Sequence, residues 1–328
     1  MKASLSEILE KNKIMVIDGS MSTALERLGA DNSSALWTAA ALADNPNLVK
    51  QVHLDYFRAG ADCGITCSYQ ATIPGLTEHG YTHDEAERLI ADSVRLFNEA
   101  RDEWWEEEGR ESGRPYPLCL AGIGPYGAYL ADGSEYVGNY GVSDEVLDEF
   151  HRRRLEILKE AGADIMLIET QPSLNETLIA ASICEELGAD YWISFSCRDG
   201  LRINEGDMIK DCAAVLSDSE RFPHLKMIGV NCSKPEYISS LVHEIRSATD
   251  IPVGVYPNSG LIYDAVSKTW TEPEGMLDFE SYALDYMKAG AVAVGGCCTT
   301  DVDHVKQTAR ARDRFLSSGG KVISYKGY

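Results

Sequence analysis

The chain has 328 residues, of which 44% are hydrophobic and 25% charged, and this composition supports a folded chain with a sizeable core. Its formal net charge of −22 repels phosphate backbones and anionic lipid surfaces, so we expect neither nucleic acids nor membranes as partners. No apolar signal segment opens the sequence and no uncharged run is long enough to cross a bilayer, which favours a cytoplasmic protein.

Eight short apolar segments recur along the chain, with charged segments of helical periodicity between them. Each short segment is continuously apolar, which is typical of a strand that is buried on both faces of a parallel sheet. The alternation of such strands with helices predicts an α/β fold. In chain order, the expected strands are 14–18, 63–68, 118–122, 165–169, 191–196, 227–231, 252–256 and 291–295.

The segments between the strands supply the helices, and several of them end in a similar way. A glycine precedes the strand in the related sequences AGAD, LGAD and AGAV, where it would end a helix in the left-handed conformation. This weak repeat and the eight strands fit a (β/α)8 TIM barrel, formed by a single domain over residues 1–328. No GxGxxG follows the first strand and no P-loop motif is present. The expected helices are 47–59, 84–108, 144–161, 175–187, 235–248 and 279–289.

Three cysteines form the sharpest group at the carboxyl ends of the expected strands, where barrel enzymes place their active sites. Cys232 ends the sixth strand within GVNC, and Cys297 and Cys298 end the eighth within GGCC. Three sulfurs suit Zn²⁺, which prefers tetrahedral soft ligation and can leave a fourth position open for substrate. The alternative is that Cys232 packs in the core while the adjacent pair is incidental or a redox couple.

The chain has nine cysteines, an odd number without the spacing of a small disulfide-rich domain. In a reducing compartment we expect thiols, either buried or bound to metal, and no disulfides. The six cysteines outside the metal group are interpreted as small buried hydrophobic residues. They are Cys63, Cys67, Cys119, Cys184, Cys197 and Cys212, of which Cys197 alone lies at a strand end.

Two carboxylates and a helix start suggest a site for an amino acid. Asp18 and Glu169 end the first and fourth strands, where they could share an α-ammonium group or act as a general acid/base pair. Asp18 could instead cap the following helix. The backbone amides of Gly19, Ser20 and Met21 open that helix, and a helix start binds a carboxylate well. Together these groups suit a zwitterionic amino acid.

Aromatic residues gather around the expected mouth of the barrel. The segment 122–140, which follows the third strand, is rich in glycine and tyrosine. Its rings could receive a cationic ligand over their faces, or they could pack together to stiffen the loop. The aromatic residues with these two interpretations are Trp37, Tyr69, Tyr126, Tyr129, Tyr136 and Tyr140.

At these positions the sequence resembles the homocysteine S-methyltransferases, most closely the branch that uses S-methylmethionine or S-adenosylmethionine. The resemblance covers nearly the whole chain. It is carried by DGSMSTALERLGAD (18–31), LVKQVHLDYFRAGADCGITCSYQAT (48–72), GPYGAYLADGSEYVGNY (124–140), GVNC (229–232), VYPNSG (255–260), YDAVSKTW (263–270) and GGCC (295–298).

The resemblance implies a mechanism and a set of site residues. The three cysteines would bind Zn²⁺, and Asp18 and Glu169 would hold the ammonium group of homocysteine. A sulfonium donor would pass its methyl group to the zinc-bound homocysteine thiolate, giving methionine. The implied substrate site also includes the helix start and the side chains of Trp37, Tyr69, Asn231 and Tyr256.

One position departs from a related branch. In the betaine-dependent enzymes a tyrosine follows the glutamate of the fourth strand and can fill the resting zinc site, whereas Thr170 follows Glu169 here. Asn231 or water would then be the resting fourth ligand. Two rival functions stay open: a metal-independent lyase that uses Asp18 and Glu169, and a thiol or zinc store without catalysis. A metal assay and an assay for methionine formation separate the three.

Overall fold

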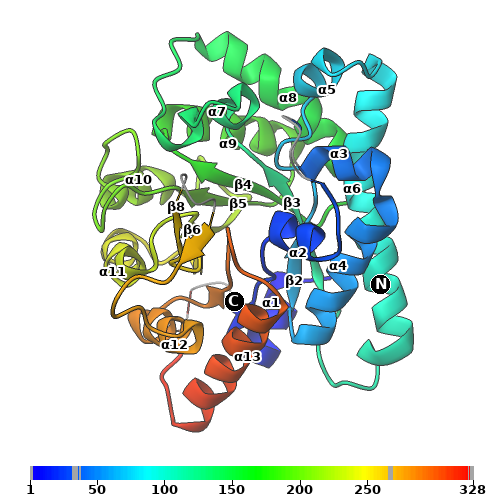
Figure 1. The fold of residues 1–328 in the computed structure, drawn as a ribbon. Coiled ribbons are helices and arrows are strands. Elements are labelled where there is room, and N and C mark those ends of the chain that lie inside the picture. Colours follow the sequence, from blue (N-terminus) through cyan, green and yellow to red (C-terminus); the bar gives the residue numbers. More distant parts are fainter. Residues whose placement is uncertain (1–2, 32–35, 37, 265–268, 324, 326–328) are drawn as a thin grey trace.

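The computed structural model describes residues 3–31, 36, 38–264, 269–323 and 325. Eight parallel strands form one sheet in the order β1-β10-β7-β6-β5-β4-β3-β2, and helices surround it (Figure 1). The predicted TIM barrel is therefore confirmed, and each predicted strand overlaps an observed one. These are β1 (Met15–Val16), β2 (Cys63–Ile65), β3 (Leu118–Ile123), β4 (Ile165–Gln171), β5 (Tyr191–Phe195), β6 (Leu225–Asn231), β7 (Val253–Tyr256) and β10 (Ala293–Val294).

The helices follow the predicted alternation, and all six predicted helices are present. The segment 84–108 differs at its end, because the helix gives way to a π-helical turn over Trp105–Gly109. The α-helices are α1 (Leu5–Asn12), α2 (Met21–Arg27), α3 (Thr38–Asp44), α4 (Pro46–Ala59), α5 (Ile73–Glu78), α6 (His83–Trp104), α7 (Tyr126–Leu130), α8 (Asp144–Glu160), α9 (Leu174–Leu187), α10 (Ile209–Leu216), α11 (Ile238–Ala248), α12 (Phe279–Ala289) and α13 (Val302–Ser317). Short 3₁₀ turns lie at η2 (Ser134–Tyr136) and η3 (Pro235–Tyr237).

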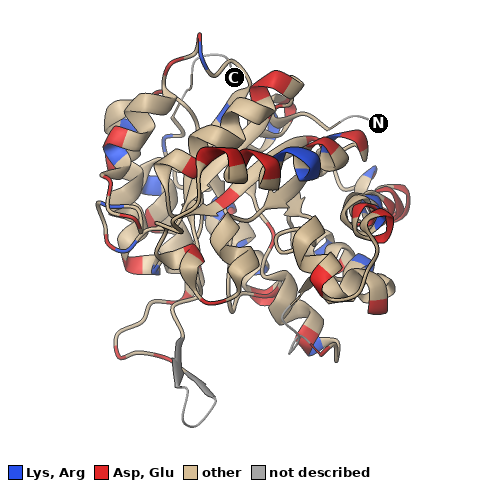
Figure 2. Cartoon of the chain, turned by 90° about the horizontal axis from the view of Figure 1, so that it is seen from above, with Lys and Arg blue, Asp and Glu red and all other residues tan. Residues whose placement is uncertain are grey.

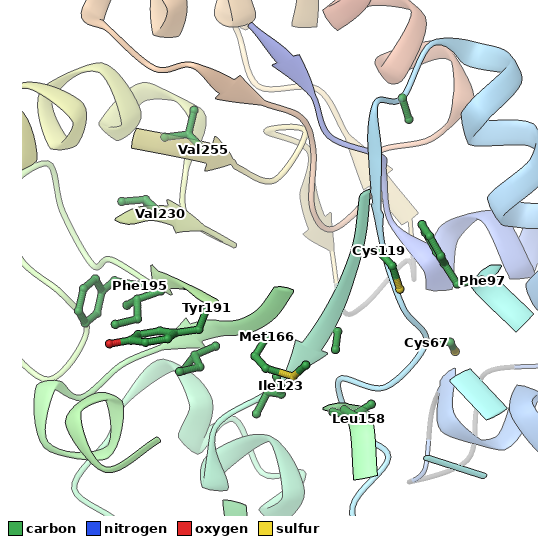
Figure 3. Packing of buried hydrophobic residues seen from close by; sticks show 14 of the residues in the cluster. Cys67, Phe97, Cys119, Ile123, Leu158, Met166, Tyr191, Phe195, Val230 and Val255 are labelled. Atoms are coloured by element: carbon green, nitrogen blue, oxygen red, sulfur yellow. The ribbon is translucent and has the colours of Figure 1, made fainter. Parts of the chain in front are cut away.

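The strands separate two hydrophobic layers, because successive side chains of a strand point to opposite faces. In β3, Leu118 and Leu120 belong to the cluster inside the barrel, whereas Cys119 and Ala121 belong to the layer between strands and helices. Figure 3 shows this outer layer, with Cys119 and other labelled residues packed around the strands. Residues of α1 join the inner cluster, so the amino-terminal helix helps to fill the barrel.

The seam between β1 and β2 closes with few main-chain hydrogen bonds. The Asp62 amide donates to the Val16 carbonyl oxygen at 2.7 Å. Asp62 Oδ2 in turn accepts from the Val16 amide, and Asp18 Oδ2 accepts from the Ile65 amide, each at 2.9 Å. Two carboxylates therefore take the place of carbonyl acceptors where the sheet meets itself.

Two features lie outside the barrel core. Acidic and basic residues lie mainly on the outer helices and loops (Figure 2). No helix among the described residues has the length and apolar character needed to cross a membrane. The short antiparallel strands β8 (Ile262–Asp264) and β9 (Thr269–Thr271) pair with each other, and the sequence did not predict them because three residues carry no clear periodicity.

Candidate metal and substrate site

The ends of β6 and β10 bring three sulfurs together. Cys232 follows β6 directly, and Cys297 and Cys298 lie just after β10. Because β7 pairs with both of these strands, residues 65 and 66 positions apart meet at one edge of the barrel. The three Sγ atoms all lie within 4.8 Å of one another, and Cys298 Sγ is 3.7 Å from Cys232 Sγ. The structure thus brings together the three cysteines that the sequence singled out.

The prediction that the chain has no disulfide is wrong for one pair, because Cys232 and Cys297 form a disulfide in this structure. The prediction rested on the redox state of the compartment. Sulfurs that converge on one point are also close enough to bond to each other. Cys298 stays a free thiol. The other six cysteines are free and buried, as predicted, and Cys197 is among them.

Backbone strain gathers beside this group. Thr170 follows Glu169 in β4 with a φ of 57°, Cys232 has 44° and Thr299 has 64°. Side chains rarely adopt this left-handed region, and such residues persist only where their surroundings hold them. These three account for half of the six non-glycine residues with positive φ among the described residues. The strain therefore coincides with the strand ends that carry the candidate site.

A cavity of about 120 Å³ opens beside the sulfurs. Most of the predicted substrate residues line this cavity. Asp18 and Asn231 do not line it, and Trp37 lies outside the described residues. The lining residues are Gly19, Ser20, Met21, Ser22, Thr38, Ile65, Thr66, Cys67, Tyr69, Gln70, Glu135, Tyr136, Glu169, Thr170, Cys232, Tyr256, Gly296, Cys297 and Cys298.

Glu169 and Asp18 are both buried, and they differ in what they face. Glu169 lines the cavity, where the Tyr256 hydroxyl donates to its Oε2 at 3.1 Å, and burial raises its pKa to about 8. Asp18 lies behind the cavity wall; burial, and then the charge of Glu169, raise its pKa well above the usual value. Asp18 Oδ1 has no hydrogen-bond partner among the described residues.

The start of α2 is organised by Ser20. The Ser20 side chain accepts from the Thr23 amide at 3.3 Å, so Ser20 rather than Asp18 caps the helix. The Ser20 amide already donates to Thr300 Oγ1 at 3.2 Å. Gly19 and Met21 line the cavity beside it, which places the predicted helix start next to the sulfurs.

Asn231 supports the strained turn after Glu169 instead of lining the cavity. Its Oδ1 accepts from the Thr170 amide and from Ser194 Oγ, both at 2.8 Å, and its Nδ2 donates to Thr170 Oγ1 at 2.7 Å. The same Nδ2 lies 4.0 Å from Cys297 Sγ. Through these contacts Asn231 links the Thr170 turn to the cysteine group. Its side-chain oxygen already accepts two hydrogen bonds.

The tyrosines of the segment 122–140, called here the tyrosine loop, have two different roles: some pack together and one faces the cavity. Tyr136 lines the cavity and its side chain interacts with the Cys298 thiol. Tyr126, Tyr129 and Tyr140 instead form an aromatic cluster with Phe150, in which the Tyr126 and Phe150 ring centroids are 5.0 Å apart. Three tyrosines therefore stiffen the loop and one faces the cavity.

Sequence reasoning missed several cavity residues. Thr66 and Cys67 follow β2 directly, but the predicted strand 63–68 extended over both, so the rule that strand ends form the site did not reach them. Glu135 comes from the 3₁₀ turn η2 inside the tyrosine loop, where only the neighbouring Tyr136 drew attention. Nothing in the local pattern distinguishes this glutamate from a surface residue.

A sequence model of the homocysteine S-methyltransferase family matches residues 15–312 of this chain. The chain belongs to the homocysteine S-methyltransferase family. Homocysteine S-methyltransferase YbgG of Bacillus subtilis is 44% identical over 306 residues, which cover 93% of this chain and 96% of that protein. Homocysteine S-methyltransferase 1 of Arabidopsis thaliana is 40% identical over 94% of this chain and 96% of its own length.

Solved structures agree with this membership. The metallated form of the homocysteine methyltransferase MmuM from Escherichia coli superposes with a TM-score of 0.83 at 36% identity, covering 93% of this chain and 99% of that one. The resemblance drawn from the sequence is thus confirmed, and this homocysteine S-methyltransferase family member is an enzyme that transfers a methyl group.

Proposed function

We propose that this homocysteine S-methyltransferase moves a methyl group from a small sulfonium compound to the sulfur of homocysteine, which binds at a Zn²⁺ site and becomes methionine. The observation that carries the proposal is the convergence of the Cys232, Cys297 and Cys298 sulfurs within 4.8 Å, on a cavity that also contains the buried Glu169. Neither a lyase nor a thiol store requires this combination of soft ligands and a substrate cavity.

The donor set fits zinc in its reduced form. Three thiolates from Cys232, Cys297 and Cys298 supply soft ligands and leave one tetrahedral position for the substrate. When bound, Zn²⁺ would lower the pKa of a thiol in that position, so that the thiol loses its proton near neutral pH. The metallated form of the Escherichia coli relative supports a metal ion in this family.

Charged and polar groups of the chain would orient homocysteine. Glu169 faces the cavity and, when ionised, would pair with the α-ammonium group, while the backbone at Gly19–Met21 would take the carboxylate. Asp18 lies behind the wall and would add negative charge there when it is ionised. A zwitterion held at both ends would direct its side-chain sulfur in one direction only, which is how binding contributes to rate.

The methyl transfer itself needs little acid or base catalysis from the protein. The homocysteine sulfur forms a bond to the methyl carbon as the methyl–sulfonium bond breaks, and the electron pair of that bond returns to the donor sulfur. The leaving group is a neutral thioether, so no proton has to be supplied. Alignment of the two sulfurs and exclusion of water are the tasks left to the cavity.

The size of the cavity bears on the choice between the two donors. Homocysteine and the methyl donor would have to share a volume of about 120 Å³. S-methylmethionine carries the reacting sulfonium without a nucleoside, whereas S-adenosylmethionine carries an additional adenosyl group. We therefore place S-methylmethionine ahead of S-adenosylmethionine as the methyl donor.

A panel of donors tests the proposal. The reduced enzyme is assayed with homocysteine and either S-methylmethionine, S-adenosylmethionine or betaine, while bound zinc is quantified. We expect methionine formation with the sulfonium donors, fastest with S-methylmethionine, and about one zinc ion per chain. Cys297→Ala should lose bound zinc and turnover together, because one of the three ligands is gone.

Cys184→Ala is the matched control, since it removes a buried thiol on α9 that lies outside the sulfur group. It should keep its zinc and its turnover. Normal zinc content and turnover in Cys297→Ala would defeat the metal site. If betaine were the only one of the three donors to support turnover, the assignment of a sulfonium donor would be wrong.

A further inference from the structure

One carboxylate in the cavity has no assigned partner. Glu135 lines the same cavity as Tyr136 and Cys298, and its Oε2 is buried without a hydrogen-bond partner among the described residues. Burial raises the pKa of Glu135, as expected for a carboxylate removed from water. None of the described residues that line the cavity is lysine or arginine, so this part of the cavity wall offers no cation to Glu135.

The position of Glu135 is fixed by the fold of the loop. A Cβ atom at Gly127 would lie 2.5 Å from the Glu135 nitrogen, so only glycine allows η2 to pack this closely on α7. The Ser196 hydroxyl, at the end of β5, donates to the Glu135 carbonyl oxygen at 3.4 Å. Glu135 is therefore held between two elements of the barrel rather than displayed on a free loop.

The two substrates bring positive charges that can be matched to the two carboxylates lining the cavity. Glu169 is matched by the ammonium group of homocysteine in the proposed function. Glu135 lies near enough to Cys298 for its charge to act on that thiol. The donor cation must also come close to the cysteine group, because its methyl carbon has to lie roughly 3–3.5 Å from the attacking sulfur.

We infer that Glu135 binds the positive sulfonium centre of the methyl donor and, with the adjacent Tyr136, sets the preference of this enzyme for a cationic donor. The inference rests on the proposed function, which it deepens by assigning the donor side of the cavity. A carboxylate attracts an onium ion by its charge, and an aromatic ring attracts it by the negative face of its π-system.

The charge of the sulfonium centre changes during the reaction, so the contact with Glu135 affects the steps of the reaction differently. The sulfonium is fully positive in the bound donor, partly positive in the transition state, and neutral once the methyl group has left. Glu135 therefore stabilises the bound donor more than the transition state, and it holds the thioether product weakly. A contact of this kind lowers the donor KM and assists product release, while it does not raise kcat.

Glu135→Gln tests the inference because it keeps the size of the side chain and removes its charge. We expect the KM for S-methylmethionine to rise roughly tenfold or more, as for a charge-assisted contact, with kcat unchanged or higher. The KM for homocysteine and the zinc content should stay within twofold. Direct binding measurements should show weaker binding of S-methylmethionine but unchanged binding of methionine, its neutral thioether counterpart.

Glu149→Gln is the matched control, because it removes the same charge from an exposed position on α8. Its donor KM should equal that of the wild type. An unchanged donor KM in Glu135→Gln, or equal loss of sulfonium and thioether binding, would overturn the inference. These results differ from failure of the proposed function, in which the wild-type enzyme itself would not turn over a sulfonium donor.

Discussion

Glu169 takes its properties from its surroundings rather than from its position in the sequence. Burial in the cavity wall disfavours its charge, and the Tyr256 hydroxyl partly offsets this by donating to Oε2. Gly122 leaves the space for the carboxylate, since a Cβ at that position would lie 2.6 Å from Glu169 Oε1. A buried acid of this kind is matched to a ligand that brings its own positive charge.

Substitution of Glu169 by glutamine should weaken homocysteine binding without releasing the metal. We expect kcat/KM for homocysteine to fall roughly 10- to 100-fold, because an ion pair with the substrate ammonium is replaced by a neutral contact. Steady-state kinetics and zinc quantification measure the two effects. An unchanged kcat/KM would remove Glu169 from the homocysteine site.

The titration of Glu169 should also be visible in the pH dependence of the wild-type enzyme. Because the pKa of Glu169 is raised to about 8, the carboxylate is mostly neutral below this pH and ionised above it. The value of kcat/KM for homocysteine should therefore increase as the pH rises through about 8. This part of the increase should be missing in Glu169→Gln, which lacks the titrating carboxyl group at this position; identical profiles in both enzymes would exclude the assignment.

The loop that carries Glu135 is anchored by its neighbouring helices. Glu176 of α9 accepts from the Tyr126 amide at 2.6 Å and from His151 Nε2 of α8 at 2.8 Å. Arg154 lies 3.0 Å from His151 Nδ1, and because a guanidinium group only donates, Nδ1 accepts and the ring hydrogen is on Nε2. This buried network joins the start of the loop to the helical layer.

Glu176→Ala should test this anchor, because it leaves the Tyr126 amide and the His151 Nε2–H unpaired in the interior. Each unpaired buried donor costs about 1–3 kcal/mol, so the free energy of unfolding, measured in urea, should fall by about 2–6 kcal/mol. Asn175→Ala is the control on the same helix, where an exposed amide contacts Asp144, and it should cost less than about 0.5 kcal/mol. Equal losses in the two variants would contradict the anchoring role.

The sequence predicted the whole fold well, since each buried parallel strand is a continuous apolar run and each helix has its own period. It predicted the cysteine group because the carboxyl ends of the barrel strands converge, and the family resemblance then assigned these three sulfurs to zinc. It could not predict that Asp18 would close a seam or that Asn231 would support Thr170. Both roles depend on hydrogen bonds between strands distant in the sequence. Glu135 escaped prediction for a related reason, because its burial comes from the packing of η2 on Gly127.

The stability of the whole molecule should depend on the protonation of His53. This residue of α4 is buried against Phe97, neither ring nitrogen has a partner among the described residues, and burial lowers its pKa to about 3. The unfolded chain binds a proton there below about pH 6.5, whereas the folded chain stays neutral. The free energy of unfolding should therefore fall by roughly 1.4 kcal/mol per pH unit between about pH 6.5 and 3.

Urea denaturation of the wild type and of His53→Leu at pH 7 and pH 5 measures this effect. On going to pH 5 the wild type should lose about 2 kcal/mol more than the variant, because leucine cannot take up a proton. The comparison cancels the contributions of the other titrating groups. Parallel behaviour of the two proteins would show that His53 already carries its proton in the folded state.

The seam between β1 and β2 has a consequence for redesign of the amino-acid pocket. Asp18 closes the wall of the barrel with one oxygen, and its other oxygen has no hydrogen-bond partner within the described part of the chain. A change at residue 18 that aims at a new amino acid would therefore also release the Ile65 amide and weaken the barrel. Protein engineers who want to admit a different thiol acceptor have more freedom around Glu169, whose carboxylate accepts from no backbone amide in the described structure.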